Sequence, residues 1–275
     1  MTRGAVDGSA APVHPEGVTG RGVVSIGLAA TLGPQMVARL APAIEAAGFH
    51  ALWMNDTPGA DALAVLEAAA TVTTRLTLAV GVLPVDRRTP AAIIADMDAR
   101  DLPQERLILG IGSGAASRGA LESVRAAATQ LRGALGAKII VGALGPRMRR
   151  LAAEHADGPL LSWLTPEIAA AQAAEARAAA PGTHVSLYAR TSAEPAAAKR
   201  MSAEIQRYEA VAAYAANFAR LGIASNETVL DAAGPVAQRL DEYRNAVDEV
   251  VLRAITPRDD LEDYARFIAA AAARL

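Results

Sequence analysis

A regular alternation of short apolar runs with longer, alanine-rich segments is the feature that most constrains how this chain can fold. The runs are rich in Val, Ile and Leu, and each is followed by a segment of helical periodicity. Continuous apolar strands that alternate with helices are typical of a parallel sheet covered on both faces. The eight runs cover residues 23–29, 50–55, 76–83, 106–112, 138–144, 159–164, 184–190 and 249–255.

Eight βα units in about 250 residues match the size of a (β/α)8 barrel. An open doubly wound sheet is the competing α/β architecture, but it usually has about five or six strands. No linker or charge block divides the chain. We therefore predict an α/β protein with one (β/α)8 (TIM) barrel domain over residues 23–275. The expected helices cover 34–47, 60–72, 90–101, 117–135, 146–156, 166–179, 196–221 and 259–274, with a further helix over 226–246.

Composition excludes several classes of protein. The chain has no cysteine, so it has no disulfide, no thiolate nucleophile and no cysteine-bound metal. The formal net charge is −2 and 4% of the residues are aromatic, which argues against a nucleic-acid or membrane partner. No run of 18 apolar residues is present to span a bilayer. The histidines have no partners at metal-ligand spacing, so we predict no metal site.

The first 22 residues contain Gly, Pro and Ser but no apolar run of the length that a signal peptide needs. Chain ends of this composition are commonly poorly ordered. We therefore predict that residues 1–22 form a flexible N-terminal tail, which includes His14, and we expect a cytoplasmic protein.

One loop that follows a strand is rich in glycine, and (β/α)8 barrels carry their sites in such loops. Gly110, Gly112 and Gly114 end the fourth run and precede a helix. The spacing through Ala115 also satisfies a loose dinucleotide fingerprint, which requires an acidic residue about 20 positions later. No Asp or Glu occurs from residue 123 to residue 153, so we exclude that type of site.

A second glycine-containing turn, Val141-Gly142-Ala143-Leu144-Gly145-Pro146, ends the fifth run and opens a helix. Cations in the first turn of a helix oppose the helix dipole, and a bound anion would relieve this repulsion. We therefore predict a phosphate between the fourth and fifth loops. The acid-free stretch around the turn carries six basic residues, namely Arg125, Arg132, Lys138, Arg147, Arg149 and Arg150.

The second run leads into Asp56 and Thr57, at the end of a strand where barrel sites form. Asp56 could instead cap the next helix, and Trp53 could serve only in packing. His50 begins the run at the opposite end, so we assign it no catalytic role. Arginines near strand ends, namely Arg87, Arg88, Arg190, Arg253 and Arg258, are candidates either for contact with an anion or for rim charge.

Four segments of the chain have a recognisable order and spacing: AGFHALWMND, TTRLTLAVGVLPVDRRTPAAI, ERLILGIGSG and VGALGPRMRRLAAEHADGPLLSWLTPE. Together they resemble the bacterial luciferase-like superfamily, and within it the oxidoreductases that use the deazaflavin coenzyme F420 or FMN. The resemblance covers residues 23–167 well and residues 184–275 mainly by pattern. It implies a (β/α)8 barrel, in agreement with the count of runs.

The resemblance also implies roles for individual residues around a bound cofactor. Asp56 and Thr57 become the candidate catalytic residues, and Trp53 and Asp56 would lie near the ring. Gly81 and Val82 match a bulge with a non-prolyl cis peptide bond that backs the ring. The residues implied to line the cofactor from its ribityl chain to its phosphate are Gly112, Ser113, Ala143, Leu144, Gly145, Pro146, Ser162 and Thr165.

The sequence departs from the family pattern in two respects. Many relatives have Asp-His where this chain has Asp56-Thr57, so the usual proton-transfer histidine is absent. General acid–base catalysis typically contributes about 10²–10⁴-fold, so turnover would be slower unless another group supplies the proton. The long insertions after the second and fourth strands are also missing, which predicts a shallow pocket.

Three functions follow as hypotheses. The first is hydride transfer between F420 or FMN and a small organic substrate, with F420 favoured by the resemblance alone. The second is a barrel of the same family that binds such a ligand with little or no turnover. The third, a lyase or isomerase of a phosphorylated metabolite, is disfavoured because neither of the two lysines, Lys138 and Lys199, is placed for a Schiff base. The resemblance also leaves a homodimer open.

Overall fold

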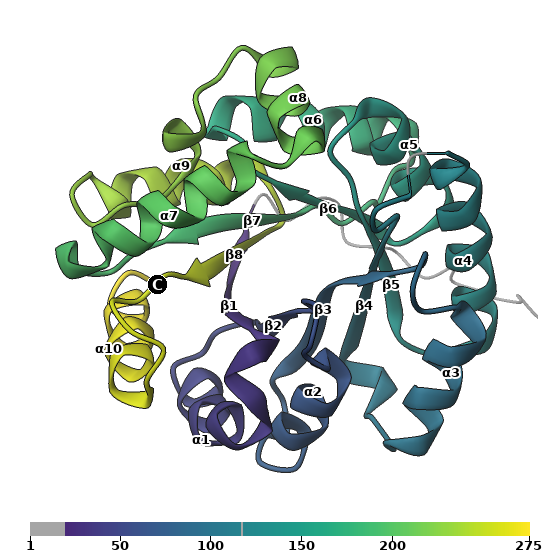
Figure 1. Ribbon diagram of the computed structural model, residues 1–275, viewed down its shortest axis with the longest axis horizontal. Helices are drawn as coiled ribbons and strands as arrows, with labels where there is room; N and C mark the ends of the chain where they lie inside the picture. The colour runs from purple at the N-terminus through teal and green to yellow at the C-terminus, as the bar shows by residue number, and fades with distance from the viewer. Residues whose placement is uncertain (1–19, 117) are drawn as a thin grey trace, which may run out of the picture.

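Eight parallel strands close into a barrel in chain order, with helices around the outside (Figure 1). The computed structural model describes residues 20–116 and 118–275. The first strand pairs with both the second and the eighth, which closes the sheet and confirms the predicted (β/α)8 barrel. The strands are β1 Val23–Ala29, β2 Ala51–Asn55, β3 Thr77–Pro84, β4 Leu107–Gly112, β5 Lys138–Gly142, β6 Gly158–Ser162, β7 Ser186–Thr191 and β8 Glu249–Ala254.

The helices pack against the outer face of the barrel through regularly spaced apolar residues. In α1 the buried side chains are Val37, Leu40, Ala41 and Ile44, which is the spacing that places residues on one helical face. The helices are α1 Gly33–Ala46, α2 Ala62–Ala70, α3 Pro90–Ala99, α4 Ala120–Ala134, α5 Pro146–His155, α6 Pro166–Ala179, α7 Ala198–Glu209, α8 Ala212–Leu221, α9 Val236–Ala246 and α10 Leu261–Ala272.

The predicted helix over residues 196–221 is wrong in one respect, because the chain forms two helices there. The break between α7 and α8 falls at Ala210 and Val211, where Val211 is extended with φ −87° and ψ 115°. No glycine or proline marks this break in the sequence. Tyr208 and Tyr214, on either side of it, pack edge to face with ring centroids 4.7 Å apart. Tertiary packing therefore supports a turn that local sequence does not signal.

The predicted helix over residues 226–246 is also too long, since only its second half is helical. Its beginning is a 3-10 turn, Ser225–Thr228, followed by an extended segment. The amide of Leu230 in that segment donates to the carbonyl of Arg190 over 2.8 Å, and its carbonyl accepts from the amide of Ser192. This pairing with the end of β7 replaces the hydrogen bonds of a helix.

A separate apolar cluster fills the inside of the barrel, apart from the larger core between strands and helices. It is built from alternate strand residues, because successive side chains of a strand point to opposite faces. Its members are Ala51, Trp53, Ala79, Ile108, Ile140, Leu160, Tyr188 and Val251. The interior is therefore solid at this level, and any open space lies toward the carboxyl ends of the strands.

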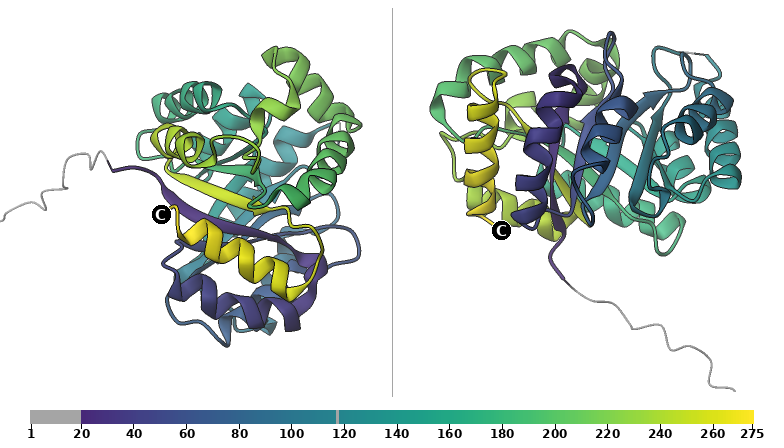
Figure 2. Two further views of the ribbon diagram at one scale, coloured as in Figure 1. Left: turned by 90° about the vertical axis from the view of Figure 1, so that its left-hand side faces the viewer. Right: turned by 90° about the horizontal axis from the view of Figure 1, so that it is seen from below.

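The C-terminus lies beside the start of β1 (Figure 2), and Arg244 of α9 joins the two at the amino-terminal end of the barrel. Its guanidinium donates to the carbonyls of Gly22 and Leu275 over 3.0 and 3.3 Å. Of the predicted tail, residues 1–19 with His14 lie outside the described residues. In the described part of the chain, no helix is both long and apolar enough to cross a bilayer.

Candidate active site at the carboxyl ends of the strands

The last inward-facing layer of the barrel is glycine on one side and polar on the other. These positions lie two residues beyond the inner apolar cluster, or four residues on β4, and so share its face of the sheet. Gly81, Gly112 and Gly142 occupy them on β3, β4 and β5. The polar positions are Asn55, Ser162, Arg190 and Arg253 on β2, β6, β7 and β8. The barrel mouth therefore has open space beside hydrogen-bond donors and positive charge.

A cavity of about 500 Å³, here called the glycine cavity, lies against the three glycines. The turn between α7 and α8 covers it with Tyr208, Val211 and Tyr214, so these helices supply the cover that the missing loop insertions do not. The sequence-predicted residues that line it are Asp56, Thr57, Gly81, Val82, Gly112, Ser113, Ala143, Leu144, Gly145 and Ser162. Loops far apart in sequence thus meet at one cavity.

The glycines of the cavity leave no room for a side chain. A Cβ on Gly81 would lie 2.7 Å from the Tyr188 ring and 2.8 Å from Leu160, and one on Gly112 would lie 2.7 Å from Val82. The peptide bond between Gly81 and Val82 is cis, as the resemblance implied. The side-chain amide of Asn55 donates to the carbonyl of Gly81 over 2.7 Å. These contacts form a fixed floor made largely of backbone.

Asp56 lies at the edge of the glycine cavity and is half-buried. Its carboxylate accepts a hydrogen bond of 3.3 Å from the amide of Ala62, while Asp61 forms the N-cap of α2. Burial raises the pKa of Asp56 above its ordinary value, although the Ala62 amide and the charges of Arg88 and Arg87 oppose the change. Asp56 thus holds a proton more readily than an exposed aspartate.

Two hydroxyl groups at the glycine cavity have no hydrogen-bond partner within the described structure. They belong to Thr57, whose Oγ1 is buried, and to Tyr188, which is 4% exposed. Burial raises the pKa of Tyr188 far above its ordinary value, so the phenol stays protonated and keeps an O–H group that can donate. An unpaired buried hydroxyl costs free energy, commonly about 1–3 kcal/mol. Both residues line the glycine cavity, so these unpaired hydroxyl groups are candidates for a hydrogen bond to a ligand.

Arg190 fixes α7 over the barrel mouth. Its guanidinium lies 4.3 Å from the ring centroid of Trp163 and 4.5 Å from that of Tyr208. It donates to the Ser162 hydroxyl over 2.5 Å and lies 3.7 Å from the Glu204 carboxylate of α7. Since Arg190 is 4% exposed, it works as an internal clamp and leaves Ser162 at the cavity wall.

The predicted phosphate position combines a free helix start with less positive charge than the sequence suggests. Gly145 lines the glycine cavity at the start of α5, while Pro146 is exposed and does not line it. The local excess of positive charge is largely cancelled by acids from outside the acid-free stretch. The ion pairs are Arg125–Glu122, Arg132–Asp157, Arg149–Glu175 and Arg150–Glu154. The turn at Gly145 therefore favours a phosphate here more than the local charge does.

Trp53 and Thr165, which the resemblance also placed near the cofactor, do not line the glycine cavity. Trp53 is fully buried beneath Gly81 in the inner cluster, and its indole donates to Glu249 over 2.7 Å. Thr165 is the N-cap of α6, and its hydroxyl accepts from the amide of Ile168. Packing and capping account for both residues.

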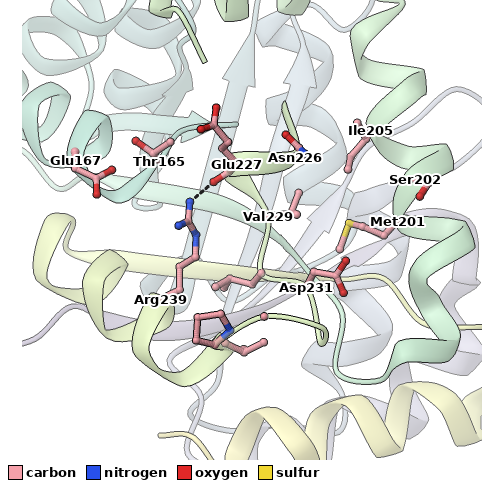
Figure 3. A pocket seen from close by; sticks show the side chains of 14 residues that line it. Thr165, Glu167, Met201, Ser202, Ile205, Asn226, Glu227, Val229, Asp231 and Arg239 are labelled. Carbon is pink, nitrogen blue, oxygen red and sulfur yellow. Dashed lines mark hydrogen bonds between the residues drawn. The ribbon is translucent and has the colours of Figure 1, made fainter. Parts of the chain in front are cut away.

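Thr165 lines a different recess, of about 600 Å³, between the start of α6, α7 and the segment before α9 (Figure 3). Part of its polar lining is engaged, since Arg239 donates to the carbonyl of Glu227. No strand of the barrel contributes a described residue to this recess. Of the segments that pair with a strand, the recess touches only the extended segment at Val229 and Leu230, which lies beside the end of β7. We therefore place the candidate site at the glycine cavity.

Sequence reasoning missed the residues that α7 and α8 bring to the site. Tyr208, Val211 and Tyr214 follow β7 by many residues, and no motif distinguishes them from surface positions of a helix. Tyr188 was hidden within an apolar run. Its two-residue spacing from Arg190 is the one signal that could have placed both on the inward face.

Comparison with known proteins shows similarity in part of the sequence and in the fold. A family model of luciferase-like monooxygenases matches residues 17–118, which run from before β1 to beyond β4. No protein of curated function matches the sequence significantly.

The solved structures of similar fold include enzymes that use different cofactors. The monooxygenase RslO1 from Streptomyces bottropensis has a TM-score of 0.70 at 18% identity, over 92% of this chain and 98% of that one. The coenzyme F420-dependent tetrahydromethanopterin reductase from Methanopyrus kandleri has a TM-score of 0.65 at 16% identity, over 93% and 99%. A diketocamphane monooxygenase from Pseudomonas putida, in complex with FMN, has a TM-score of 0.65 at 13% identity, over 91% and 97%. Residues 17–118 are thus similar to luciferase-like monooxygenases, and the closed barrel as a whole is similar in fold to these solved structures.

Proposed function

We propose that the protein is an oxidoreductase that binds coenzyme F420 or FMN in the glycine cavity and transfers a hydride between it and a small organic substrate. The observation that carries this proposal is the cavity itself, which combines a backbone floor with two unpaired hydroxyl groups. Proteins of similar fold use either cofactor. We favour F420 from the sequence resemblance alone.

The residues of the cavity suit a flat ring with a phosphate-bearing tail. Gly81, Val82 and Gly112 would lie against the ring, because only a surface without side chains admits a planar group so close to the strands. Ser113 would line the ribityl chain. The amide of Gly145 and the hydroxyl of Ser162 would hold the phosphate at the start of α5.

When bound, such a cofactor accepts or donates the hydride, and the protein orients it and excludes water. Thr57 and Tyr188 would donate hydrogen bonds to polar atoms at the cavity floor. Asp56 would hold or release a proton at its carboxylate, since its raised pKa brings that group closer to neutral pH. This assigns to Asp56 the proton transfer that a histidine performs in many relatives.

A specific observation also supports the second hypothesis, a barrel that binds the ligand with little turnover. Thr57 stands where the proton-transfer histidine is expected, and its hydroxyl cannot act as a general base near neutral pH. The two functions differ in whether the bound cofactor is reduced.

Titration with FMN and with F420, followed by ring absorbance and fluorescence, tests the proposal. Ala213 of α8 is exposed at the rim of the cavity, whereas Ala216 is exposed elsewhere on the same helix. We expect Ala213→Trp to weaken cofactor binding and Ala216→Trp to leave it unchanged. Absence of binding by either cofactor to the native protein would overturn both functions. Binding without reduction by any donor would favour the second.

A further inference from the structure

A second cavity lies beside the glycine cavity at the barrel mouth, and we call it the arginine cavity. It has a volume of about 420 Å³, within the range of small-molecule sites. Asn55, Thr57 and Tyr208 line both cavities, so the two adjoin along these residues. A molecule in the arginine cavity would therefore lie next to a cofactor in the glycine cavity.

Three arginines and two carboxylates supply the charges that line the arginine cavity. Arg200 pairs with Asp259 over 2.5 Å, and Arg207 pairs with Glu204 over 2.6 Å. Within each pair the positive and negative charges cancel. The third arginine, Arg253, therefore decides the net charge of the lining.

Arg253 has no carboxylate within 4.0 Å in residues 20–116 and 118–275. Its guanidinium donates to the carbonyl of the neighbouring Ala254 over 2.5 Å, and its remaining N–H groups make no hydrogen bond to the described protein. The residue is half-buried, and it shares the inward face of β8 with Glu249 and Val251. Among the described residues this half-buried cation has no directly paired carboxylate, and Asp259 of the same lining acts on it only from a longer distance.

The chemistry of this lining selects a particular kind of ligand. The surplus of one positive charge matches a monoanion, and the planar fork of a guanidinium fits a carboxylate through two parallel hydrogen bonds. Ala29 and Ile255 add apolar wall to the same cavity. We infer that the arginine cavity binds the substrate, that the substrate is a small organic molecule with one carboxylate, and that Arg253 holds this carboxylate. The role of this molecule as the substrate of hydride transfer rests on the proposed function. The carboxylate-binding site itself rests on Arg253 alone.

Binding of benzoate to the protein without cofactor, measured by calorimetry and by saturation-transfer NMR, tests the inference. Benzamide serves as the neutral isostere and phenylphosphate as a dianion. We expect benzoate to bind the native protein roughly tenfold more tightly than benzamide, because charge-assisted hydrogen bonds are the stronger ones. Equal affinities of benzoate and benzamide, no saturable benzoate binding, or preference for phenylphosphate would each overturn the inference.

Variants then locate the site. We expect Arg253→Gln to weaken benzoate binding about tenfold and to leave benzamide binding unchanged, with partial retention in Arg253→Lys. Arg39→Gln removes the same charge from an exposed position on α1 and should leave benzoate binding within about twofold of native. Benzoate binding that is insensitive to Arg253→Gln would overturn the assignment. Benzoate binding without any binding of FMN or F420 would overturn the proposed function and keep the carboxylate site.

Discussion

The buried carboxylate of Glu249 has four hydrogen-bonding partners at the amino-terminal end of the barrel. Its Oε1 accepts hydrogen bonds from Ser25 over 2.5 Å and Trp53 over 2.7 Å, and its Oε2 accepts one from Ser186 over 2.9 Å and lies 3.3 Å from His184. Burial alone would raise the pKa of Glu249, but the hydrogen bonds from His184, Ser25 and Trp53 outweigh it and keep the pKa below its ordinary value.

A lowered pKa makes Glu249 a source of stability at neutral pH. Its contribution is complete above the ordinary glutamate pKa of about 4.3 and is lost as the pH falls through the lower value of the folded state. We expect Glu249→Gln to reduce the free energy of unfolding by about 2–4 kcal/mol at pH 7, since an uncharged group cannot satisfy these donors equally well.

Urea unfolding at pH 7 and at pH 3.5 checks this prediction. The native protein should lose more stability than the variant between the two pH values. Glu122→Gln is the matched control, because Glu122 is exposed and pairs only with Arg125. An equal loss in the native protein and in Glu249→Gln would contradict the assigned role.

Tyr188 and Tyr243 form a natural pair for testing the unpaired hydroxyl. The hydroxyl of Tyr243 donates to the carbonyl of Leu164 over 2.7 Å, whereas that of Tyr188 has no partner within the described residues. We expect Tyr243→Phe to cost about 1–2 kcal/mol and Tyr188→Phe to cost nothing or to stabilise the fold slightly. Thermal unfolding measures both, and cofactor titration of Tyr188→Phe should show weaker binding.

At the scale of elements, α7 and α8 decide what the barrel mouth can hold. They are joined to the barrel by the Arg190 clamp and by the cluster of Trp163, Met201 and Phe218. Part of this contact comes from α8, where Arg220 donates to the carbonyl of Leu144 over 3.2 Å. Movement of these two helices would open the glycine cavity.

Removing the clamp should loosen these helices without unfolding the barrel. We expect Arg190→Met to speed amide hydrogen exchange in α7 and α8 while the strands stay protected, because local openings need only break local contacts. Arg207→Met is the control, since Arg207 also pairs with Glu204 but is 60% exposed. Faster exchange throughout the strands of Arg190→Met would show instead that the arginine supports the whole barrel.

The same helices show where sequence reasoning ends at this scale. The order of the strands and the positions of most helices could be predicted, because apolar periodicity is a local property of the chain. The break at Val211 and the extended segment at Leu230 depend on contacts with Trp163 and with β7. Such contacts join residues that are distant in sequence, so no local pattern reports them.

At the scale of the whole molecule, closure of the barrel couples the site to global stability. Every strand contributes to one closed sheet, and the cavity draws on β2 to β7. A cofactor that binds only the folded barrel stabilises it by about 2.7 kcal/mol at 100 times its dissociation constant. We expect the melting temperature to rise by about 5–10 °C under these conditions.

A thermal scan of the native protein with FMN and with F420 measures this rise. The two ligands should give equal shifts at equal multiples of their dissociation constants, and the tighter ligand should give the larger shift at equal concentrations. Ala213→Trp should show a smaller shift at the same ligand concentration than Ala216→Trp. A shift that is the same in both variants would place the ligand outside the glycine cavity.

By itself the sequence determined the barrel, the ends of its strands and the glycines of its mouth, because periodicity and spacing are properties of neighbouring residues. The tertiary structure decided how charges are compensated and which polar groups are left without partners. Arg149 meets Glu175, Trp53 meets Glu249, and Arg253 meets no carboxylate within the described chain. Pairing depends on the positions of residues far apart in sequence, and those positions exist only once the barrel has closed.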